Sequence, residues 1–112
     1  MSSNCIFCKI INREIPAKLV RETPQLIAIE DINPKAPTHL LVIPKQHFDN
    51  IQGVQDQSLL GALFQGASEM AESLKLNRGF RLIINTGPDG GQTVDHLHIH
   101  LLAGRSLGWP PG

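Results

Sequence analysis

The sequence predicts an α+β protein in which a mostly antiparallel sheet of about five strands is combined with one long and one short helix. Two observations support this prediction. Short apolar runs bounded by turn residues outnumber helical patterns, and the one long helical pattern falls between runs. At 112 residues the chain can bury one core but not two, so we expect a single domain over 1–112.

The first expected helix covers Cys5–Arg13, with Asn4 as its N-cap and Pro16 beyond its end. We expect Ile6, Ile10 and Ile11 to form its buried stripe, with Phe7 beside them. Two strands at 19–22 and 26–30, joined by Thr23-Pro24-Gln25, read as a hairpin. Further strands are expected at 39–44, 80–85 and from His96 onward.

The long helix begins at Asp56 or Ser58 and ends near Asn77 or Gly79. Its apolar residues recur at three- and four-residue steps and give one broad stripe: Leu59, Leu60, Leu63, Phe64, Ala67, Met70, Ala71 and Leu74. Gly61 and Gly66 each lower helix propensity by roughly 1 kcal/mol relative to Ala. A close contact, such as a dimer interface, would explain their presence.

Composition excludes several classes of partner. Lys plus Arg equals Asp plus Glu at 10 each, so we expect neither nucleic acid nor an acidic membrane as a principal partner. No apolar run approaches the ~20 residues of a membrane span. The N-terminus lacks the pattern of a signal peptide, so the expected location is the cytoplasm, where Cys5 and Cys8 would be reduced.

Three of the five histidines fall within five residues, in the sequence GGQTVDHLHIHLL of 90–102. Because a strand turns successive side chains to opposite faces, His96, His98 and His100 would share one face. On a helix, His98 would point away from the other two. The period of two favours the strand and a functional cluster over three surface histidines.

The turn Gly90-Gly91-Gln92-Thr93 leads directly into these histidines. Glycines let backbone N–H groups approach an anion, and a Thr hydroxyl adds a donor, so the combination suggests phosphate chemistry. A neutral histidine can attack phosphorus, and His98 is the best candidate nucleophile. His100 and His39 could bind phosphate oxygens or manage a proton. Asp31 could accept hydrogen bonds from ribose hydroxyls or simply cap a turn.

The pattern His96-Leu97-His98-Ile99-His100-Leu101-Leu102 resembles the motif of the histidine-triad family. The stretches APTHLLVIPK at 36–45 and GWPPG at 108–112 resemble its Hint branch, the histidine triad nucleotide-binding proteins. The blocks come in the family's order and cover nearly the whole chain. Two departures are visible. Thr93 stands where many Hint members have Ser, and Asp95 where many have an aromatic residue, which puts local packing near the site in question.

The resemblance implies hydrolysis of purine nucleoside phosphoramidates and mixed anhydrides such as aminoacyl-adenylates, through a nucleotidyl-histidine intermediate and without a catalytic cofactor. The substrate would be an AMP or GMP moiety. By position, His98 is the nucleophile, assisted by His100, His39 and Thr93. The residues implied to bind the nucleotide are Phe7, Ile15, Asp31, Ile32, Asn85, Gly91, Gln92, Thr93, His98, His100 and Trp109.

Cys5-x-x-Cys8 is the common half of a tetrahedral zinc site. Some bacterial relatives bind zinc with such a pair and two histidines at positions matching His47 and His96, so the resemblance implies a structural zinc. The alternative is two reduced thiols on a short helix. Because His96 belongs to the face of His98, the metal would lie close beside the active site.

Three functional hypotheses remain open from the sequence. The first is an enzyme using covalent histidine catalysis, and the second a nucleotide-binding scaffold or regulatory module with incidental hydrolysis. The third treats His96, His98 and His100 as ligands of a catalytic metal. The resemblance also implies a homodimer, in which helices pair, two sheets join edge to edge, and Trp109 reaches toward the partner's active site.

Overall fold

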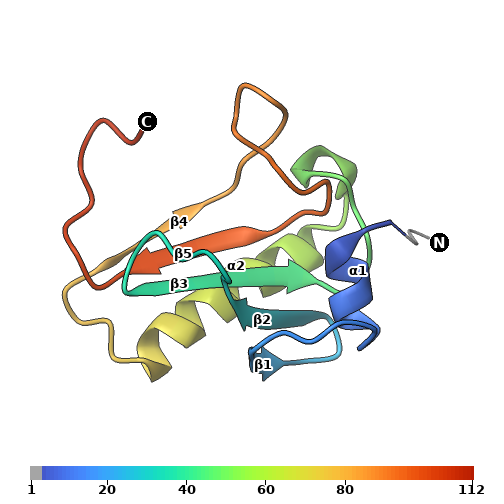
Figure 1. The fold of residues 1–112 in the computed structure, drawn as a ribbon, viewed down its shortest axis with the longest axis horizontal. Coiled ribbons are helices and arrows are strands. Elements are labelled where there is room, and N and C mark those ends of the chain that lie inside the picture. The colour runs from blue at the N-terminus through green and yellow to red at the C-terminus, as the bar shows by residue number, and fades with distance from the viewer. Residues whose placement is uncertain (1–3) are drawn as a thin grey trace.

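The computed structural model describes residues 4–112, which form one five-stranded antiparallel sheet with the strand order β1-β2-β3-β5-β4 (Figure 1). The elements are α1 (Ile6–Ile11), β1 (Leu19–Glu22), β2 (Leu26–Glu30), β3 (Thr38–Pro44), the 3₁₀ turn η1 (Ile51–Gly53), α2 (Gln57–Ser73), β4 (Phe80–Ile83) and β5 (Ile99–Ala103). The predicted α+β class is confirmed. Joining of the sheet to that of a second copy stays a prediction.

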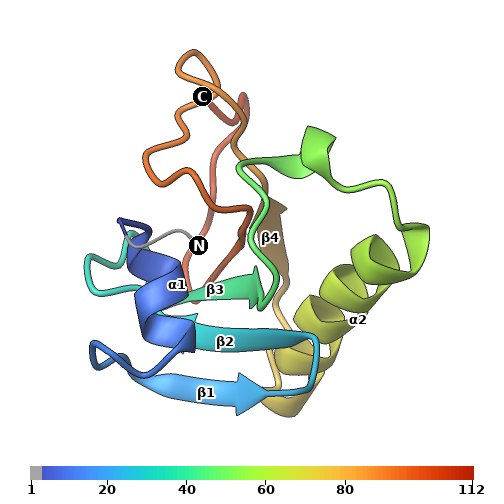
Figure 2. The same ribbon diagram turned by 90° about the vertical axis from the view of Figure 1, so that its right-hand side faces the viewer.

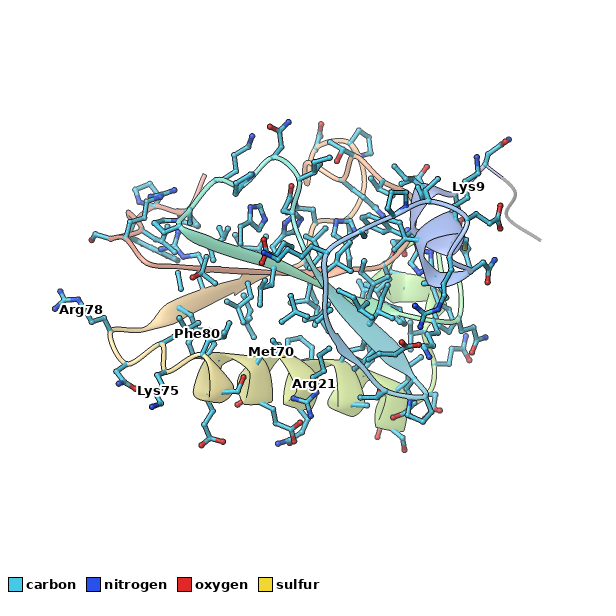
Figure 3. The ribbon with its side chains drawn as sticks, turned by 60° about the horizontal axis from the view of Figure 1, so that its bottom comes forward. Lys9, Arg21, Met70, Lys75, Arg78 and Phe80 are labelled. Atoms are coloured by element: carbon cyan, nitrogen blue, oxygen red, sulfur yellow. The ribbon has the colours of Figure 1, made fainter. Side chains whose placement is uncertain are left out.

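The two helices lie on opposite faces of this sheet (Figure 2). Side chains alternate along β3, so Leu40 and Val42 are buried toward α2 while Leu41 and Ile43 belong to the cluster around α1. The larger core is on the α2 face, where Met70 extends from the helix toward the sheet (Figure 3). The smaller cluster on the α1 face is anchored by Phe7. The face under α1 carries the candidate site.

The hairpin of β1 and β2 has the bounds predicted from the sequence. The last two strands are shorter than expected, since β4 ends at Ile83 and β5 begins only at Ile99. His96, Leu97 and His98 therefore precede β5. The reason is a different hydrogen-bond partner: the Leu97 N–H donates to the Phe48 carbonyl at 2.7 Å, whereas pairing with β3 begins at Ile99.

Helix α2 begins after Asp56, whose carboxylate accepts a hydrogen bond from the Ser58 N–H at 2.9 Å, as one of the two predicted caps. It ends at Ser73, earlier than expected, because Lys75 takes a left-handed conformation with φ of 56°. The Leu76 N–H then bonds back to the Ala71 carbonyl at 3.1 Å and closes the helix. In residues 4–112, no helix is long and apolar enough to cross a membrane.

Helix α1 differs from the expectation in its length and in its buried face. It covers Ile6–Ile11 with Cys5, not Asn4, as N-cap, and Arg13 ends it in a left-handed conformation with φ of 62°. Phe7 is its one buried residue, and Ile6 is 47% exposed. Ile6 and Ile10 instead line a cavity, so the apolar residues of α1 serve a pocket wall as well as the core.

The two glycines of α2 have different surroundings. A Cβ on Gly66 would lie 3.1 Å from Cδ2 of Leu26, so this glycine permits close packing of α2 on the sheet of its own chain. A Cβ on Gly61 would meet nothing within 4 Å. The close contact expected at Gly66 is therefore explained within one chain and no longer argues for a dimer.

Candidate active site

A cavity of about 660 Å³ lies on the α1 face of the sheet. Most of its wall is apolar, contributed by α1, the following segment and strands β2 and β3, and its polar groups include Asp31 and two histidines. Seven residues predicted to bind nucleotide line it: Phe7, Ile15, Asp31, Ile32, Thr93, His98 and His100. Four other predicted residues, Asn85, Gly91, Gln92 and Trp109, lie outside its lining. An apolar pocket with one polar end is typical of a site for a base and its phosphate.

The hydrogen bonds of His39 and His100 assign the tautomers of both rings. The Lys35 N–H donates to Nδ1 of His39 at 3.0 Å, so the proton of a neutral His39 is on Nε2. That Nε2–H faces Nδ1 of His100 at 2.9 Å, which makes His100 Nδ1 the acceptor. The proton of His100 is then on Nε2. Because His100 lines the cavity, it can offer this N–H to an anionic ligand.

His98 has the opposite tautomer. Its Nδ1 lies 2.7 Å from the carbonyl oxygen of His96, to which it donates, so the lone pair is on Nε2. Every buried side-chain nitrogen or oxygen of residues 4–112 has a hydrogen-bond partner. The hydrogen bond of the His98 ring is made by Nδ1, so Nε2 cannot be one of these buried atoms. Because His98 lines the cavity, Nε2 is accessible from it. His98 thus combines a fixed orientation with an available nucleophilic nitrogen.

Burial keeps these three imidazoles neutral. It is the main cause that lowers the pKa of His39 and of His98, with the nearby Asp31 carboxylate opposing the change in each case. For His100, burial and then the neighbouring His98 and His39 lower the pKa to about 4. A neutral His98 is the form that can attack phosphorus, and a neutral His100 retains a single N–H.

Asp31 has contacts that fit both of its predicted roles. Its Oδ1 accepts a hydrogen bond from the Asn33 N–H at 2.8 Å, as in a turn-capping Asp. Its Oδ2 lies 3.4 Å from Nε2 of His39, and the side chain lines the cavity. The cap uses one oxygen, so the second can still accept from a ligand hydroxyl.

The glycine turn before the histidines is held in place largely by Gln92. Its amide nitrogen donates to the carbonyls of Asp49 at 2.6 Å and Val94 at 3.0 Å, and its oxygen accepts from the Gly87 N–H. The Gly91 N–H is bonded within the turn, to the Pro88 carbonyl at 3.1 Å. In this arrangement Gln92 supports the turn, and Thr93 is the turn residue at the cavity.

The C-terminal segment is bonded to β4 through Arg81 and exposes its tryptophan. Nη2 of Arg81 donates to the carbonyls of Leu107 at 3.3 Å and Gly108 at 2.8 Å. Trp109 follows directly and is 83% exposed. It does not line the cavity of its own chain. The predicted contact of Trp109 with a partner's site stays a prediction.

The four predicted metal ligands come together beside the cavity. One atom from each of Cys5, Cys8, His47 and His96 lies within 4.8 Å of all the others. Sγ of Cys5 is 3.3 Å from Nδ1 of His96, and Sγ of Cys8 is 3.3 Å from Nδ1 of His47. Helix α1 therefore brings its thiols to two histidines that are distant in sequence.

The protonation of the two histidines fits a cation at this cluster. Nε2 of His47 faces the Asp49 carboxylate at 2.8 Å, and Nε2 of His96 faces the Pro44 carbonyl at 2.9 Å, so each ring carries its proton on Nε2. The two Nδ1 lone pairs then point at each other across 3.0 Å. The cysteine sulfurs lie 3.3 Å from these two nitrogens, so thiol protons or a shared cation would satisfy both lone pairs. Two sulfurs with two imidazole nitrogens are a ligand set that suits zinc.

Phe7 lies between this cluster and His98 and contacts both. Its ring is edge-on to His96 with centroids 5.9 Å apart and edge-on to His98 with centroids 5.0 Å apart. The metal cluster therefore lies next to the cavity, as the sharing of one face by His96 and His98 predicts. Phe7 itself lies on α1 between the two cysteines and lines the cavity.

The hypothesis of a catalytic metal held by the three histidines of the motif does not fit this geometry. Nδ1 of His96 faces the cysteines, while Nδ1 of His98 is bonded to a carbonyl and Nδ1 of His100 to His39. A second cluster, Asp31 with His39 and His100, also has ligand atoms close together. There, the Lys35 N–H occupies Nδ1 of His39 and leaves a proton on Nε2, where a metal would need a lone pair.

Three supporting residues were not found by sequence reasoning. Lys35 contributes a backbone N–H, which any residue except proline could supply, so no side-chain pattern reveals it. Arg105 bonds to the Lys35 carbonyl from the C-terminal segment, a contact that only the tertiary structure shows. Asp49 lies two residues after His47, and this short spacing is the one sequence feature that could have indicated their hydrogen bond.

Comparison with known proteins agrees with the motif and the fold. The HIT domain family matches residues 12–107. The chain is 45% identical over 115 residues to a 14 kDa zinc-binding protein of Zea mays, covering 98% of this chain and 89% of that one.

Two solved structures are also similar to this chain. A HIT family hydrolase from Legionella pneumophila Philadelphia 1 superimposes with a TM-score of 0.94 at 47% identity, covering 97% of this chain and 100% of that one. A histidine triad nucleotide-binding protein from Candida albicans gives a TM-score of 0.84 at 33% identity, with 96% and 83% covered. The chain therefore belongs to the HIT domain family.

Proposed function

We propose that the protein is a purine nucleoside phosphoramidase that cleaves adenosine phosphoramidates and aminoacyl-adenylate-like mixed anhydrides through a nucleotidyl group on His98. The observation that carries the proposal is the state of His98. Its Nδ1–H is held by the His96 carbonyl, and its Nε2 lone pair is open to a cavity. The similarity to a hydrolase and to a nucleotide-binding protein supports the same class of substrate.

The cavity suggests how such a substrate would lie. The base occupies the apolar part beside Phe7, Ile15 and Ile32, and the ribose hydroxyls donate to the free oxygen of Asp31. The α-phosphate then reaches the end where His98, His100 and Thr93 lie. The Nε2–H of His100 and the Thr93 hydroxyl donate to phosphate oxygens, which favours the charge that develops there.

The reaction then runs in two balanced steps. In the first, the Nε2 lone pair of His98 forms a bond to the α-phosphorus, and the P–N or P–O bond to the leaving group breaks. The leaving amine takes up a proton from water. In the second step water attacks the same phosphorus, the bond to His98 breaks, one proton of the attacking water returns to solvent, and the nucleoside monophosphate leaves. Throughout, the His96 carbonyl holds Nδ1–H and stabilises the positive charge on the substituted ring.

We also propose that Cys5, Cys8, His47 and His96 bind a structural zinc ion. The paired Nδ1 lone pairs beside two cysteines support this, as does the similarity to a zinc-binding protein of Zea mays. Bound zinc would link α1 to the segments that carry His47 and His96 and would add folding stability. It takes no part in the two steps above.

Trapping the covalent intermediate tests the proposed function. We expect that rapid denaturation during turnover of an adenosine phosphoramidate yields a protein whose mass is increased by one nucleotidyl group, located on the peptide that contains His98. The quench should be alkaline, because a phosphorus–nitrogen bond to histidine is labile in acid. A protein that turns the substrate over at full rate without this adduct would refute the covalent mechanism. A protein that binds the nucleotide without turnover would favour the scaffold hypothesis.

A further inference from the structure

The loop of residues 31–37, between β2 and β3, controls the tautomers at one end of the cavity. Its Lys35 N–H donates to Nδ1 of His39 at 3.0 Å, and this bond places the proton of His39 on Nε2. The His39 Nε2–H in turn makes Nδ1 of His100 an acceptor. The position of one peptide N–H in this loop therefore decides which nitrogen of His100 carries a proton.

Two contacts from the segment after β5 hold this loop. The Arg105 guanidinium donates to the Lys35 carbonyl from Nε at 3.1 Å and from Nη2 at 2.9 Å. Just before it, Gly104 has a φ of 94°, and a Cβ built there would lie 2.8 Å from Cβ of Pro37. The backbone of 104–105 is thus in direct contact with the loop. Arg105 bonds to Lys35, the residue whose N–H donates to His39.

We propose that Arg105 is a positioning residue for His100, acting through the Lys35 peptide and His39. Arginine suits this task because its planar group presents two N–H donors to one carbonyl, which a lysine ammonium cannot do with the same fixed orientation. The inference rests on the proposed function in one respect, namely that the Nε2–H of His100 serves the substrate phosphate.

The Lys35 N–H, His39 and His100 form a relay in which each hydrogen bond fixes the next proton position. Loss of the Arg105 contact should reverse this relay. With the loop released, the Lys35 N–H meets Nδ1 of His39 less often, and His39 can take its proton on Nδ1 instead. Its Nε2 then becomes an acceptor facing Nδ1 of His100, so His100 must move its own proton to Nδ1. Nε2 of His100 would be left without the hydrogen that donates to phosphate. Arg105 does not line the cavity, so the substitution would act on His100 through this exchange of protons.

The test compares Arg105→Met with Arg78→Met in protein labelled with ¹⁵N at histidine. Arg78 is the matched control because it extends from the turn before β4 away from the body of the molecule (Figure 3). Two-bond ¹H–¹⁵N spectra report the protonated nitrogen of each ring without any substrate. We expect His39 and His100 to carry the proton on Nε2 in the parent and in Arg78→Met. In Arg105→Met, a population with the proton on Nδ1 should appear for both residues.

Turnover supplies the second readout. We expect kcat on an adenosine phosphoramidate to fall about fivefold in Arg105→Met, the factor that corresponds to one hydrogen bond of ordinary net strength. The KM should change by less than about twofold, since the base and ribose contacts are intact. Arg105→Lys should lie between the parent and Arg105→Met in both readouts.

Unchanged tautomers in Arg105→Met would overturn the proposal, whatever happens to turnover. Shifted tautomers with an unchanged kcat would also overturn it, because His100 would then be positioned for no catalytic purpose. Failure of the proposed function itself looks different. In that case the parent forms no nucleotidyl adduct and has no turnover to compare, while the tautomer spectra still report the relay. If Arg105→Met does not fold, Arg105→Lys carries both readouts.

Discussion

The role of each imidazole in this protein is set by the partner of its other nitrogen. His98 gives its Nδ1–H to a carbonyl and keeps a lone pair on Nε2, whereas His100 accepts at Nδ1 and keeps a hydrogen on Nε2. His96 gives its Nε2–H to the Pro44 carbonyl and turns Nδ1 to the cysteines. His98 is thereby suited to act as a nucleophile, His100 as a hydrogen-bond donor and His96 as a metal ligand.

Replacement of His98 by asparagine tests the nucleophile. We expect His98→Asn to fold and to bind nucleotide, because Asp31 and the apolar wall are intact. Turnover should fall by several orders of magnitude, since an amide nitrogen is a poor nucleophile. His100→Ala and His39→Ala should lose less, because each only assists. Steady-state rates with parallel affinity measurements check this. A rate within about tenfold of the parent, or ~1.4 kcal/mol in barrier height, would contradict covalent catalysis.

The lowered pKa of His100 also predicts how stability depends on pH. Its pKa of about 4 in the folded protein is below the 6.5 of an unperturbed histidine, with His98, His39 and Asp31 as the groups that face it. Between those values the unfolded chain binds a proton that the folded chain does not, so stability decreases as pH falls from about 6.5 toward 4. One such proton contributes a slope of at most about 1.4 kcal/mol per pH unit.

Denaturant unfolding of the parent and of His100→Gln at several pH values measures this effect. The variant should show a shallower pH dependence over the same window, with the two curves parallel above about pH 7. Equal slopes between pH 4 and 6.5 would mean that His100 does not titrate in this way.

At the scale of elements, the sequence predicted what depends on periodicity and missed what depends on single backbone conformations. The hairpin and β3 follow from apolar runs bounded by turns, and their placement was confirmed. Both helices ended early because Arg13 and Lys75, neither Gly nor Asn, take left-handed conformations. β5 starts late because the segment before it bonds to Phe48 instead of to β3.

The candidate site shows the same division. Side chains with distinctive chemistry, such as His98, Asp31 and Cys5, could be selected from the sequence, and the structure brings them to one face of the sheet. The groups that set their protonation could not be selected, since Lys35 acts through its backbone and Arg105 through a contact 70 residues away in sequence. Residue type predicts the reacting groups, and tertiary structure supplies their orientation.

Helix α1 carries a prediction about the metal cluster. In Cys5→Ser/Cys8→Ser the thiolates are lost, so the melting temperature should fall while most turnover is retained, because no cysteine lines the cavity. Metal analysis of protein purified without chelator should find about one zinc per chain in the parent and little in the variant. A parent without zinc would refute the structural-zinc proposal. Activity abolished by a chelator in protein that is still folded would point to a catalytic metal instead.

For the molecule as a whole, we predict a homodimer joined at an edge of the sheet. Within residues 4–112 the sheet has two edge strands, β1 and β4, and exposed edges are ordinarily covered or paired. Both edges expose apolar side chains, Leu19 at 42% on β1 and Phe80 at 43% on β4. β4 is the favoured edge because Arg81 ties the segment that precedes Trp109 to this strand. In a dimer whose interface is at β4, the exposed Trp109 of each chain would lie toward the second copy.

Sedimentation at micromolar concentration checks the dimer. We expect Phe80→Asp on β4 to weaken association and Leu19→Asp on the opposite edge, β1, to leave it unchanged. A parent that sediments as a monomer would defeat the prediction, and a stronger effect of Leu19→Asp would move the interface to β1.

The alternation of faces along β3 has a consequence for what a substitution in this strand affects. Even-numbered positions, Leu40 and Val42, are buried against α2, while the odd-numbered His39 and Leu41 belong to the side of the cavity. Adjacent residues of one short strand therefore support opposite faces of the sheet, the packing of α2 on one side and the wall of the cavity on the other. A substitution at Leu40 or Val42 is therefore felt first in the packing of α2, whereas a substitution at His39 or Leu41 is felt first on the side of the cavity.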